Sequence, residues 1–353
     1  MSSMNTSNLR VALPLTFRAL AIEKPGLPVT EITKTVSALA DDEALIRVGY
    51  ASINKMDPLL ALRNGFQLPE PYVLGFDFSG QVVALGSPGG LELGEVVFGN
   101  TITGGGFAEY IVVKKNTVVP CGPLPAVEAA AYGIAYLTAY ESMVLAGQIE
   151  QHAGKWIYIA GAAGGVGHFA TQLAKLYGLK VIGTAGKAPS LALLKTLGVD
   201  HFLDYSKQNV VDEILALTQG RGVDLVYDST YNAASYQQSA KVVASDGTYI
   251  RLGPQAHMAN FGLPDLAGEV EARGAKFVVG DPGRYRTDPE FIPHADQLLR
   301  GPAQAKSWYQ EKKLAPIVTH TVKFTAVALQ NAFEEFRAGT INVGKVVVQV
   351  RSL

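Results

Sequence analysis

A glycine-rich segment carries the strongest chemical signal in this 353-residue chain. It reads Trp156-Ile-Tyr-Ile-Ala-Gly-Ala-Ala-Gly-Gly-Val-Gly-His168, and it joins an apolar stretch, expected to be a strand, to an amphipathic stretch, expected to be a helix. Glycine lets the backbone approach a phosphate, and a helix N-terminus directs free N–H groups and partial positive charge at it. Gly164, Gly165, Val166 and Gly167 are therefore predicted to hold a pyrophosphate.

This turn departs at one position from the Gly-x-Gly-x-x-Gly pattern of dinucleotide-binding proteins. Ala162 stands where the first glycine is expected, whereas Gly164 and Gly167 occupy the second and third positions. The strand before the turn, the helix after it and the next predicted strand, about 20 residues on, support the dinucleotide interpretation. A tight structural turn without a ligand is the alternative.

The end of the second predicted strand favours NADP(H) over NAD(H). NAD-binding proteins usually carry Asp or Glu there, which holds the ribose 2′-hydroxyl. Here no Asp or Glu occurs between residues 168 and 199. A carboxylate would repel a 2′-phosphate, whereas Thr184 can donate a hydrogen bond to it and Lys187 can add positive charge. We therefore predict NADP(H) as the cofactor; the alternative for Lys187 is a solvated surface lysine.

The segments that must position this turn alternate between predicted strands and helices. Such alternation predicts a doubly wound parallel sheet of the Rossmann type, with helices on both faces. Strands are predicted at 156–160, 180–183, 201–203, 224–227 and 248–252, and helices at 168–177, 190–197 and 210–217.

The first third of the chain has a different texture. Short apolar stretches, separated by turns rich in Gly and Pro, predict a barrel-like β domain. Its strands are predicted at 44–48, 80–85, 95–99 and 108–114. A buried helix is predicted at 125–146, another helix at 326–336 and a last strand at 345–350.

Composition excludes several classes of function. Apolar residues make up 48% of the chain and charged residues 17%, which is typical of a globular protein and not of a disordered one. The 30 Lys and Arg are balanced by 31 Asp and Glu, so no nucleic-acid or membrane partner is predicted. No signal peptide or membrane-spanning stretch is recognised, and a cytoplasmic location is expected.

The sequence does not predict a metal site. Cys121 is the only cysteine, so neither an internal disulfide nor a cysteine-rich zinc site is possible. The six histidines show no ligand spacing and are expected at the surface or as capping residues. Cys121 is expected to pack as a small apolar side chain.

A series of motifs, in order along most of the chain, resembles the medium-chain dehydrogenase/reductase superfamily and, within it, the zinc-free quinone oxidoreductase (zeta-crystallin-like) branch. Where a zinc-binding relative carries Gly-His-Glu, this chain has Gly75-Phe76-Asp77. Leu59 and Phe66 stand about where that branch often has hydroxyl-bearing aromatic residues. The matching motifs are Asn54-Lys-Met-Asp57 with Arg63 and Gly65, Gly105-Gly-Phe-Ala-Glu-Tyr110, Leu137-Thr-Ala-Tyr140, Gly222-Val-Asp-Leu-Val-Tyr-Asp228 and Gly344-Lys345-Val-Val-Val.

The resemblance implies two domains and further cofactor contacts. A GroES-like (chaperonin-10-type) catalytic domain would comprise residues 1–135 and be completed by 306–353, with a Rossmann domain at 136–305. A homodimer is also implied. The cofactor contacts it implies beyond the glycine turn are Thr138, Gly183, Thr184, Lys187, Tyr205, Asn232, Leu252, Gly253 and Lys345.

The activity implied is NADPH-dependent, zinc-independent reduction of a small quinone or α,β-unsaturated carbonyl by hydride transfer. Tyr50, Asn54 and Tyr132 are candidates for a catalytic hydrogen-bond donor, and ordinary packing is the alternative for each. An enoyl-thioester reductase is a second possibility, in which Lys114, Lys115 and Arg63 could bind a phosphopantetheine or coenzyme A arm. A non-catalytic NADPH-binding or sensing protein is a third.

Overall fold

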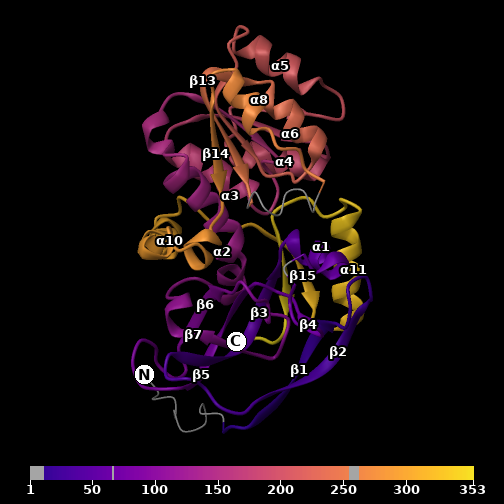
Figure 1. Cartoon of the computed structure of the whole chain (residues 1–353), viewed down its shortest axis with the longest axis vertical. Helices are drawn as coiled ribbons and strands as arrows, with labels where there is room; N and C mark the ends of the chain where they lie inside the picture. Colours follow the sequence, from indigo (N-terminus) through magenta and orange to yellow (C-terminus); the bar gives the residue numbers. More distant parts are fainter. Residues whose placement is uncertain (1–11, 66, 254–261) are drawn as a thin grey trace. The chain divides into compact units, whose positions relative to one another are not determined.

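The structure, a computed structural model, describes residues 12–65, 67–253 and 262–353 (Figure 1). Two compact units are formed. Unit 1 comprises Met1–Ile134, Pro316–Ile341 and Lys345–Leu353, and unit 2 comprises Ala135–Ala315 and Asn342–Gly344. The boundary expected at residue 306 falls inside helix α10 (Ala295–Gln310), and residues 306–315 lie in unit 2 in this division.

Unit 2 is built on a parallel sheet with strand order β11-β10-β9-β12-β13-β14. Its four inner strands are buried along most of their length, whereas the edge strands β11 and β14 are more exposed. Strand β12, for example, reads Val-Asp-Leu-Val-Tyr-Asp and is buried at every position, as expected for a sheet covered on both faces. The predicted Rossmann-type sheet is confirmed. The strands are β9 (Trp156–Ala160), β10 (Lys180–Ala185), β11 (His201–Asp204), β12 (Val223–Asp228), β13 (Val243–Leu252) and β14 (Lys276–Gly280).

Helices follow most of these strands and flank the sheet (Figure 1). Helix α5 begins where the Asn209 side chain accepts hydrogen bonds from the Val211 and Asp212 N–H groups. Buried residues of α5, α6 and α8 join one apolar cluster with strand residues of the sheet. The helices are α3 (Gly167–Leu176), α4 (Ala188–Thr196), α5 (Val210–Leu217), α6 (Ala233–Ala240), α8 (Ala267–Ala272), α9 (Arg284–Thr287) and α10.

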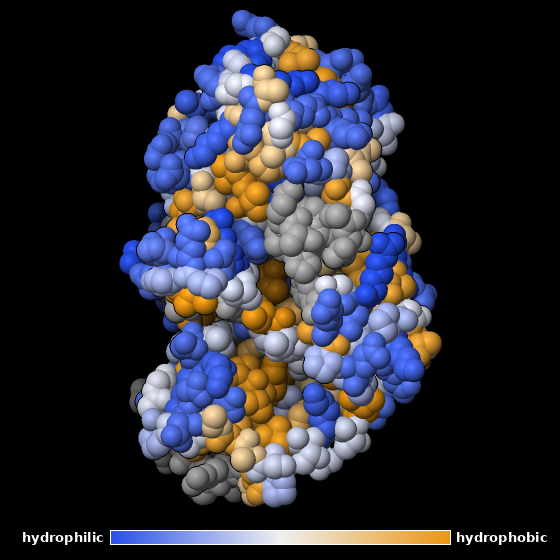
Figure 2. Space-filling model, in the orientation of Figure 1, coloured by the Kyte–Doolittle hydropathy of each residue, from blue (hydrophilic) through white to orange (hydrophobic). Residues whose placement is uncertain are grey.

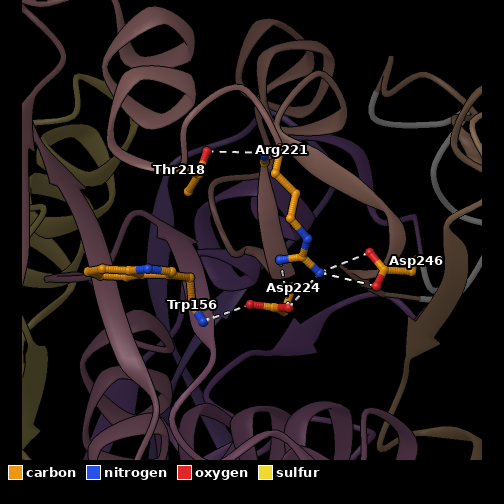
Figure 3. A network of polar contacts seen from close by, with 6 residues as sticks. Trp156, Thr218, Arg221, Asp224 and Asp246 are labelled. Atoms are coloured by element: carbon orange, nitrogen blue, oxygen red, sulfur yellow. Dashed lines mark hydrogen bonds and ion pairs between the residues drawn. The ribbon is translucent and has the colours of Figure 1, made fainter.

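A polar network ties the amino ends of β9 and β12 (Figure 3). Asp224 accepts a hydrogen bond from the Trp156 N–H at 2.9 Å and forms an ion pair with Arg221 at 3.0 Å. Arg221 also contacts Asp246 at 2.9 Å. The side chain of Asp224 is 9% exposed, whereas that of Asp246 is 70% exposed. This network lies at the opposite ends of the strands from the glycine turn, so its role is structural.

Unit 1 contains two sheets in which most strands pair antiparallel. One sheet has strand order β15-β16-β3-β5-β6-β8, with β7 pairing β3, and the other has the order β2-β1-β4. The C-terminal strand β16 pairs with β3, so the tail completes the N-terminal domain as the GroES-like architecture requires. The strands are β1 (Leu15–Ile22), β2 (Val29–Val36), β3 (Glu43–Ile53), β4 (Tyr72–Val73), β5 (Asp77–Leu85), β6 (Val96–Asn100), β7 (Tyr110–Lys114), β8 (Val118–Pro120), β15 (Val318–Lys323) and β16 (Lys345–Gln349).

The segment predicted as one helix at 125–146 is not continuous. It consists of α2 (Ala126–Ala139), which is kinked at Gly133, followed by the π-helix η3 (Tyr140–Ala146). Gly133 has φ 7° and ψ −125°, which interrupts the helical hydrogen bonds. Helices α1 (Met56–Arg63) and α11 (Ala326–Arg337), also in unit 1, contact each other.

The surface is mainly hydrophilic with scattered apolar patches, as the face drawn in Figure 2 illustrates. None of the helices in the described part of the chain combines the length and apolar character needed to cross a membrane. Cys121 is buried, as predicted. Large apolar side chains that remain exposed are Leu27, Leu62, Ile102, Phe202, Tyr205, Ile292, Val327 and Leu353.

Candidate functional site

The glycine turn follows β9 and leads into α3, as the sequence predicts. A Cβ built on Gly167 would lie 2.0 Å from the Gly161 carbonyl oxygen and 2.9 Å from Ala162 Cα, so only glycine fits at the start of α3. The Gly164 N–H donates to the Gly161 carbonyl at 2.9 Å and closes the turn. No side chain caps α3 at Val166, which leaves the helix terminus suited to an anion.

Gly161 supplies the turn that the sequence pattern assigns to position 162. It has φ +70°, a conformation that favours glycine, and it immediately follows β9. Ala162 is buried, its carbonyl accepts a hydrogen bond from Thr171 Oγ1 at 3.2 Å, and its Cβ would be 3.1 Å from a Cβ on Gly183. Gly183 therefore lets β10 approach the turn closely. The sequence already contained this signal, because Gly161 lies one position before the expected first glycine.

The end of β10 carries the residues predicted to contact a 2′-phosphate. Lys187 is exposed at the N-cap of α4, and Tyr205 is 56% exposed. The Tyr205 ring covers Gly186, because a Cβ there would lie 2.3 Å from Tyr205 Cζ. Thr184 is only 3% exposed, and its hydroxyl lies 3.5 Å from that of Tyr158. Lys187 and Tyr205 thus present polar groups at this edge, whereas Thr184 is largely enclosed.

One carboxylate near this edge is absent from the residues predicted by sequence. Asp204 ends β11 and pairs in register with Ala185 of β10. Its carboxylate accepts hydrogen bonds from Ser206 and forms an ion pair with Lys207 at 3.0 Å, and these contacts lower its pKa. Asp204 is therefore ionised, with its charge partly balanced by Lys207.

A buried carboxylate organises the loop after β12. Asp228 Oδ1 accepts hydrogen bonds from the Thr230 N–H at 2.9 Å and Thr230 Oγ1 at 2.6 Å, and its Oδ2 accepts from Ser235 and Ser239 Oγ at 2.7 Å. Burial raises the pKa of Asp228, and these donors oppose that rise. A Cβ on Gly161 would lie 3.2 Å from Thr230 Cγ2, so the loop and the glycine turn are neighbours at the carboxyl edge of the sheet.

The other predicted cofactor residues of unit 2 lie at the start of α6, at the end of β13 and in α2. Asn232 is exposed and caps α6 by accepting from the Ser235 N–H at 3.0 Å. Leu252 is fully buried, and the Gly253 N–H donates to the Gly280 carbonyl at 2.8 Å. Thr138 lies in the last turn of α2 and is 7% exposed.

The C-terminal tail also reaches the glycine turn, which the sequence did not indicate. The Gly344 N–H donates to the Ala163 carbonyl at 2.8 Å. Asn342 Oδ1 accepts a hydrogen bond from Ser190 Oγ of α4 at 3.1 Å. Residues 342–344 therefore connect the glycine turn to the start of α4 within unit 2.

A second polar centre lies in unit 1, where strand register brings together residues remote in sequence. Ser52 of β3 pairs with Asp77 of β5, and β16 pairs with β3 so that Val346 faces Ile53. We call Ser52, Asn54, Asp57, Asp77 and Lys345 the buried polar cluster; all are 9% exposed or less.

Lys345 is the cation of this cluster. Its Nζ donates to Asn54 Oδ1 at 2.6 Å and contacts Asp77 Oδ2 at 3.4 Å. Burial lowers the pKa of Lys345, and the charges of Asp77 and Asp57 oppose that change. Asn54 Nδ2 donates to Asp77 at 2.8 Å, so both ends of the Asn54 amide already have partners within the cluster. Asn54 is better suited to holding Lys345 than to donating to a substrate.

Asp57 holds the turn that leads into α1. Its carboxylate accepts hydrogen bonds from the Asn54 N–H at 2.7 Å and the Gly75 N–H at 2.8 Å. Burial raises the pKa of Asp57 to about 7, although these two donors oppose the shift. Asp57 therefore titrates close to neutrality.

The remaining sequence candidates lie outside the buried polar cluster. Tyr50 is half-buried on β3 opposite Gln349, and Tyr132 is buried in α2 with its ring 6.1 Å from that of Phe98.

His168, expected at the surface or as a cap, is fully buried, with Nδ1 2.9 Å from the Gly164 carbonyl oxygen. Phe66 lies outside the described residues. Within the described ranges, no group of three His, Cys, Asp or Glu is placed to hold a metal.

The two units match known domains of one class, the nicotinamide-dependent dehydrogenases and reductases. Residues 40–125 match the alcohol dehydrogenase GroES-like domain, and residues 165–292 match the zinc-binding dehydrogenase domain. The chain belongs to the medium-chain dehydrogenase/reductase superfamily.

Its relatives include reductases of more than one kind. A quinone oxidoreductase of Pongo abelii is 30% identical over 69% of this chain and 77% of that protein. The trans-enoyl reductase pgmF of Aspergillus terreus is 28% identical over 88% of this chain and 87% of that protein. A phenolphthiocerol/phthiocerol polyketide synthase of Mycobacterium tuberculosis is 31% identical over 94% of this chain, but the chain spans only 15% of the length of that polypeptide.

A solved structure shows the same fold over nearly the whole chain. An alcohol dehydrogenase superfamily protein from Novosphingobium aromaticivorans superposes with a TM-score of 0.80 at 25% identity, covering 95% of this chain and 100% of that one. The architecture of a GroES-like domain with a Rossmann-type domain is thus shared with a member of the superfamily.

Proposed function

We propose that this protein is an NADPH-dependent, metal-independent reductase of small quinones or α,β-unsaturated carbonyl compounds. The observation that carries the proposal is the glycine turn, where a Cβ on Gly167 would meet the Gly161 carbonyl at 2.0 Å and no side chain caps the following helix. A pyrophosphate fits such a turn because backbone N–H groups and the helix dipole face it. Gly164, Gly165, Val166 and Gly167 would hold this group.

The choice of NADPH rests on the edge next to that turn. Lys187 is exposed there, and Tyr205 presents its ring over Gly186, as a flat surface against an adenosine would require. No acidic residue occurs between 168 and 199. The charge of the nearby Asp204 is partly balanced by Lys207 at 3.0 Å. A 2′-phosphate would therefore meet a net attraction from Lys187 at this edge.

The chemistry of the unit 1 residues suits conjugated acceptors. The bound cofactor would supply the hydride, and negative charge would develop on an enolate or hydroquinone oxygen. Lys345, held by Asn54 and Asp77, is the cation that would favour this change without a metal ion. The chain's single cysteine cannot build the cysteine-rich centre of a zinc alcohol dehydrogenase.

The test is an acceptor panel with NADPH and NADH side by side. Quinones and short enones should be reduced with NADPH, and NADH should serve at least about tenfold less efficiently if Lys187 contributes about 1.4 kcal/mol to binding. The proposal is contradicted if none of these acceptors supports oxidation of NADPH, or if NADH serves as well as NADPH.

An enoyl-thioester reductase is the second candidate, favoured by the similarity to the trans-enoyl reductase pgmF. The lysines considered for binding a thioester arm are already engaged. Lys114 pairs with Asp42 at 2.8 Å, and Lys115 Nζ donates to the Ser87 carbonyl at 2.6 Å. Both lysines therefore have partners within the protein, which favours the free enone as the substrate. Faster turnover of an enoyl-coenzyme A than of the matching free enone would favour the second candidate.

A further inference from the structure

Asp77 is the residue through which the buried polar cluster is joined. Its side chain is fully buried. Oδ1 accepts the Ile134 N–H at 2.7 Å, and Oδ2 accepts Ser52 Oγ at 3.0 Å and Asn54 Nδ2 at 2.8 Å. Oδ2 also lies 3.4 Å from Lys345 Nζ. One carboxylate therefore connects β3, β5, α2 and β16.

Two of these contacts fall where the chain passes between its two units. Ile134 is the last residue of the first segment of unit 1, and Lys345 is the first residue of its last segment. Helix α2 runs on beyond Ile134 to Ala139 and carries Thr138. Thr138 and Lys345 are the two residues expected at the nicotinamide end of the cofactor. Asp77 thus contacts Ile134, after which the chain leaves unit 1, and Lys345, at which it returns.

The kink in α2 is shaped around this carboxylate. A Cβ on Gly133 would lie 2.1 Å from Asp77 Oδ1, so any other residue there would displace the side chain. The non-helical backbone at Gly133 frees the next N–H from the helical pattern, and Asp77 accepts it. Asp77 acts as the N-terminal cap of the helical segment that continues to Thr138.

The charge of Asp77 also maintains Lys345. A buried ammonium that loses its counter-ion is strongly destabilised, and it either moves or loses its proton. Asp57, the other acid of the cluster, accepts hydrogen bonds from the Asn54 and Gly75 N–H groups, whereas Asp77 contacts Lys345 directly. Asp77 is therefore the direct counter-ion.

We propose that Asp77 is a positioning residue for hydride transfer, which fixes Lys345 and the helical segment leading to Thr138 by holding the chain at two of the four points where it crosses between the units. This inference rests on the proposed function. It concerns how the reacting ends are oriented, whereas cofactor affinity would be set by the glycine turn in unit 2.

The test compares Asp77→Asn with Asp224→Asn, the same change at a buried carboxylate of unit 2. In the cofactor-free protein, amide hydrogen exchange at Ile134 should become at least about tenfold faster in Asp77→Asn, because a charged acceptor is lost. With saturating NADPH, single-turnover reduction should slow about a hundredfold, as expected from a small misplacement of reacting groups. The Kd for NADPH should change less than about threefold. Asp224→Asn should leave Ile134 exchange and turnover as in the unaltered protein.

Exchange and turnover that both stay within about twofold of the unaltered protein overturn the proposal, as does slower turnover without faster exchange at Ile134. Equal acceleration in Asp224→Asn overturns it too, since the effect would then be general loosening. If Asp77→Asn does not fold, Ser52→Ala removes one donor to Oδ2 of the Asp77 carboxylate. This variant should shift both readouts less but in the same direction, and no shift in either overturns the proposal. If the unaltered protein reduces no acceptor, the proposed function fails. Amide hydrogen exchange at Ile134 then still decides whether Asp77 holds the chain at Ile134.

Discussion

The carbonyl oxygen of Gly161 faces position 167 so closely that a Cβ there would lie 2.0 Å away. The atoms nearest this Cβ belong to the backbone of Gly161 and Ala162, so they cannot rotate aside as a side chain could. The sequence requirement for glycine at 167 thus follows from the turn that brings α3 onto the end of β9. No side chain caps α3 at this point, so we expect a phosphate to bind at the N-terminal end of the helix.

Gly167→Ala should abolish measurable NADPH binding, because the methyl group forces the turn open. Gly268→Ala is the matched control, since a Cβ at Gly268 in α8 meets nothing within 4 Å. The control should bind NADPH normally and be slightly more stable, by up to about 1 kcal/mol, as alanine is the better helix former. Fluorescence titration with NADPH and thermal unfolding measure both effects. Normal NADPH binding by Gly167→Ala would show that the turn is not the phosphate site.

Lys187→Ala should raise the KM for NADPH roughly tenfold, the loss of about 1.4 kcal/mol of binding, and leave the KM for NADH nearly unchanged. The reason is that only NADPH carries the 2′-phosphate. Lys195→Ala is the control on the same helix; its ammonium lies 5.3 Å from the Phe202 ring centroid and should affect neither cofactor. Equal weakening of NADPH and NADH in Lys187→Ala would remove Lys187 from the 2′-phosphate site.

Asp57 should make the free energy of unfolding depend on pH. Its pKa in the folded protein is raised to about 7 from an ordinary value of 3.8, so the folded state holds the proton more tightly. The resulting stabilisation is complete below the unfolded pKa and is lost as pH rises toward 7. The difference in unfolding free energy between the unaltered protein and Asp57→Asn should therefore fall with rising pH, by up to about 1.4 kcal/mol per unit.

Urea unfolding at several pH values between about 5 and 7 measures this difference directly. Taking the difference cancels other groups such as Glu141, whose pKa burial also raises to about 7. A difference that is constant or grows with pH would mean that the hydrogen bonds from the Asn54 and Gly75 N–H groups keep Asp57 ionised.

Asp224→Asn should lower the free energy of unfolding by about 1–2 kcal/mol, because a buried charge-assisted contact to Arg221 is lost. Asp246→Asn removes the other partner of the same arginine (Figure 3), but its side chain is 70% exposed and stability should change little. Chemical denaturation of both variants gives the comparison. NADPH binding should be normal in both, and a loss of binding would contradict the purely structural role of this network.

Local patterns in the sequence were sufficient for five strands of the Rossmann-type sheet and for the glycine turn, but not for the sixth strand, β14. Strand β9, the turn and α3 are contiguous, and their apolar pattern and glycines act over a few residues. The kink in α2 was not predictable in the same way. It depends on Gly133 meeting Asp77, and the pattern of apolar residues at 125–146 is that of an uninterrupted helix.

The buried polar cluster depends on register between strands far apart in sequence. Lys345 and Asn54 meet because β16 pairs with β3, and neither residue carries a local sign of that contact. Asn54 and Lys345 were singled out only through the family resemblance, and their mutual hydrogen bond was not anticipated. Asp204 was not included among the site residues for a similar reason, since an acid was sought only at the end of β10 and not on its neighbour β11.

The most direct test of the central claim is calorimetric titration of the unaltered protein with NADPH and NADH in the same buffer. We expect NADPH to bind at least about tenfold more tightly, through the glycine turn and the Lys187 edge. Failure to bind NADPH at millimolar concentration, or equal affinity for the two cofactors, would contradict the account.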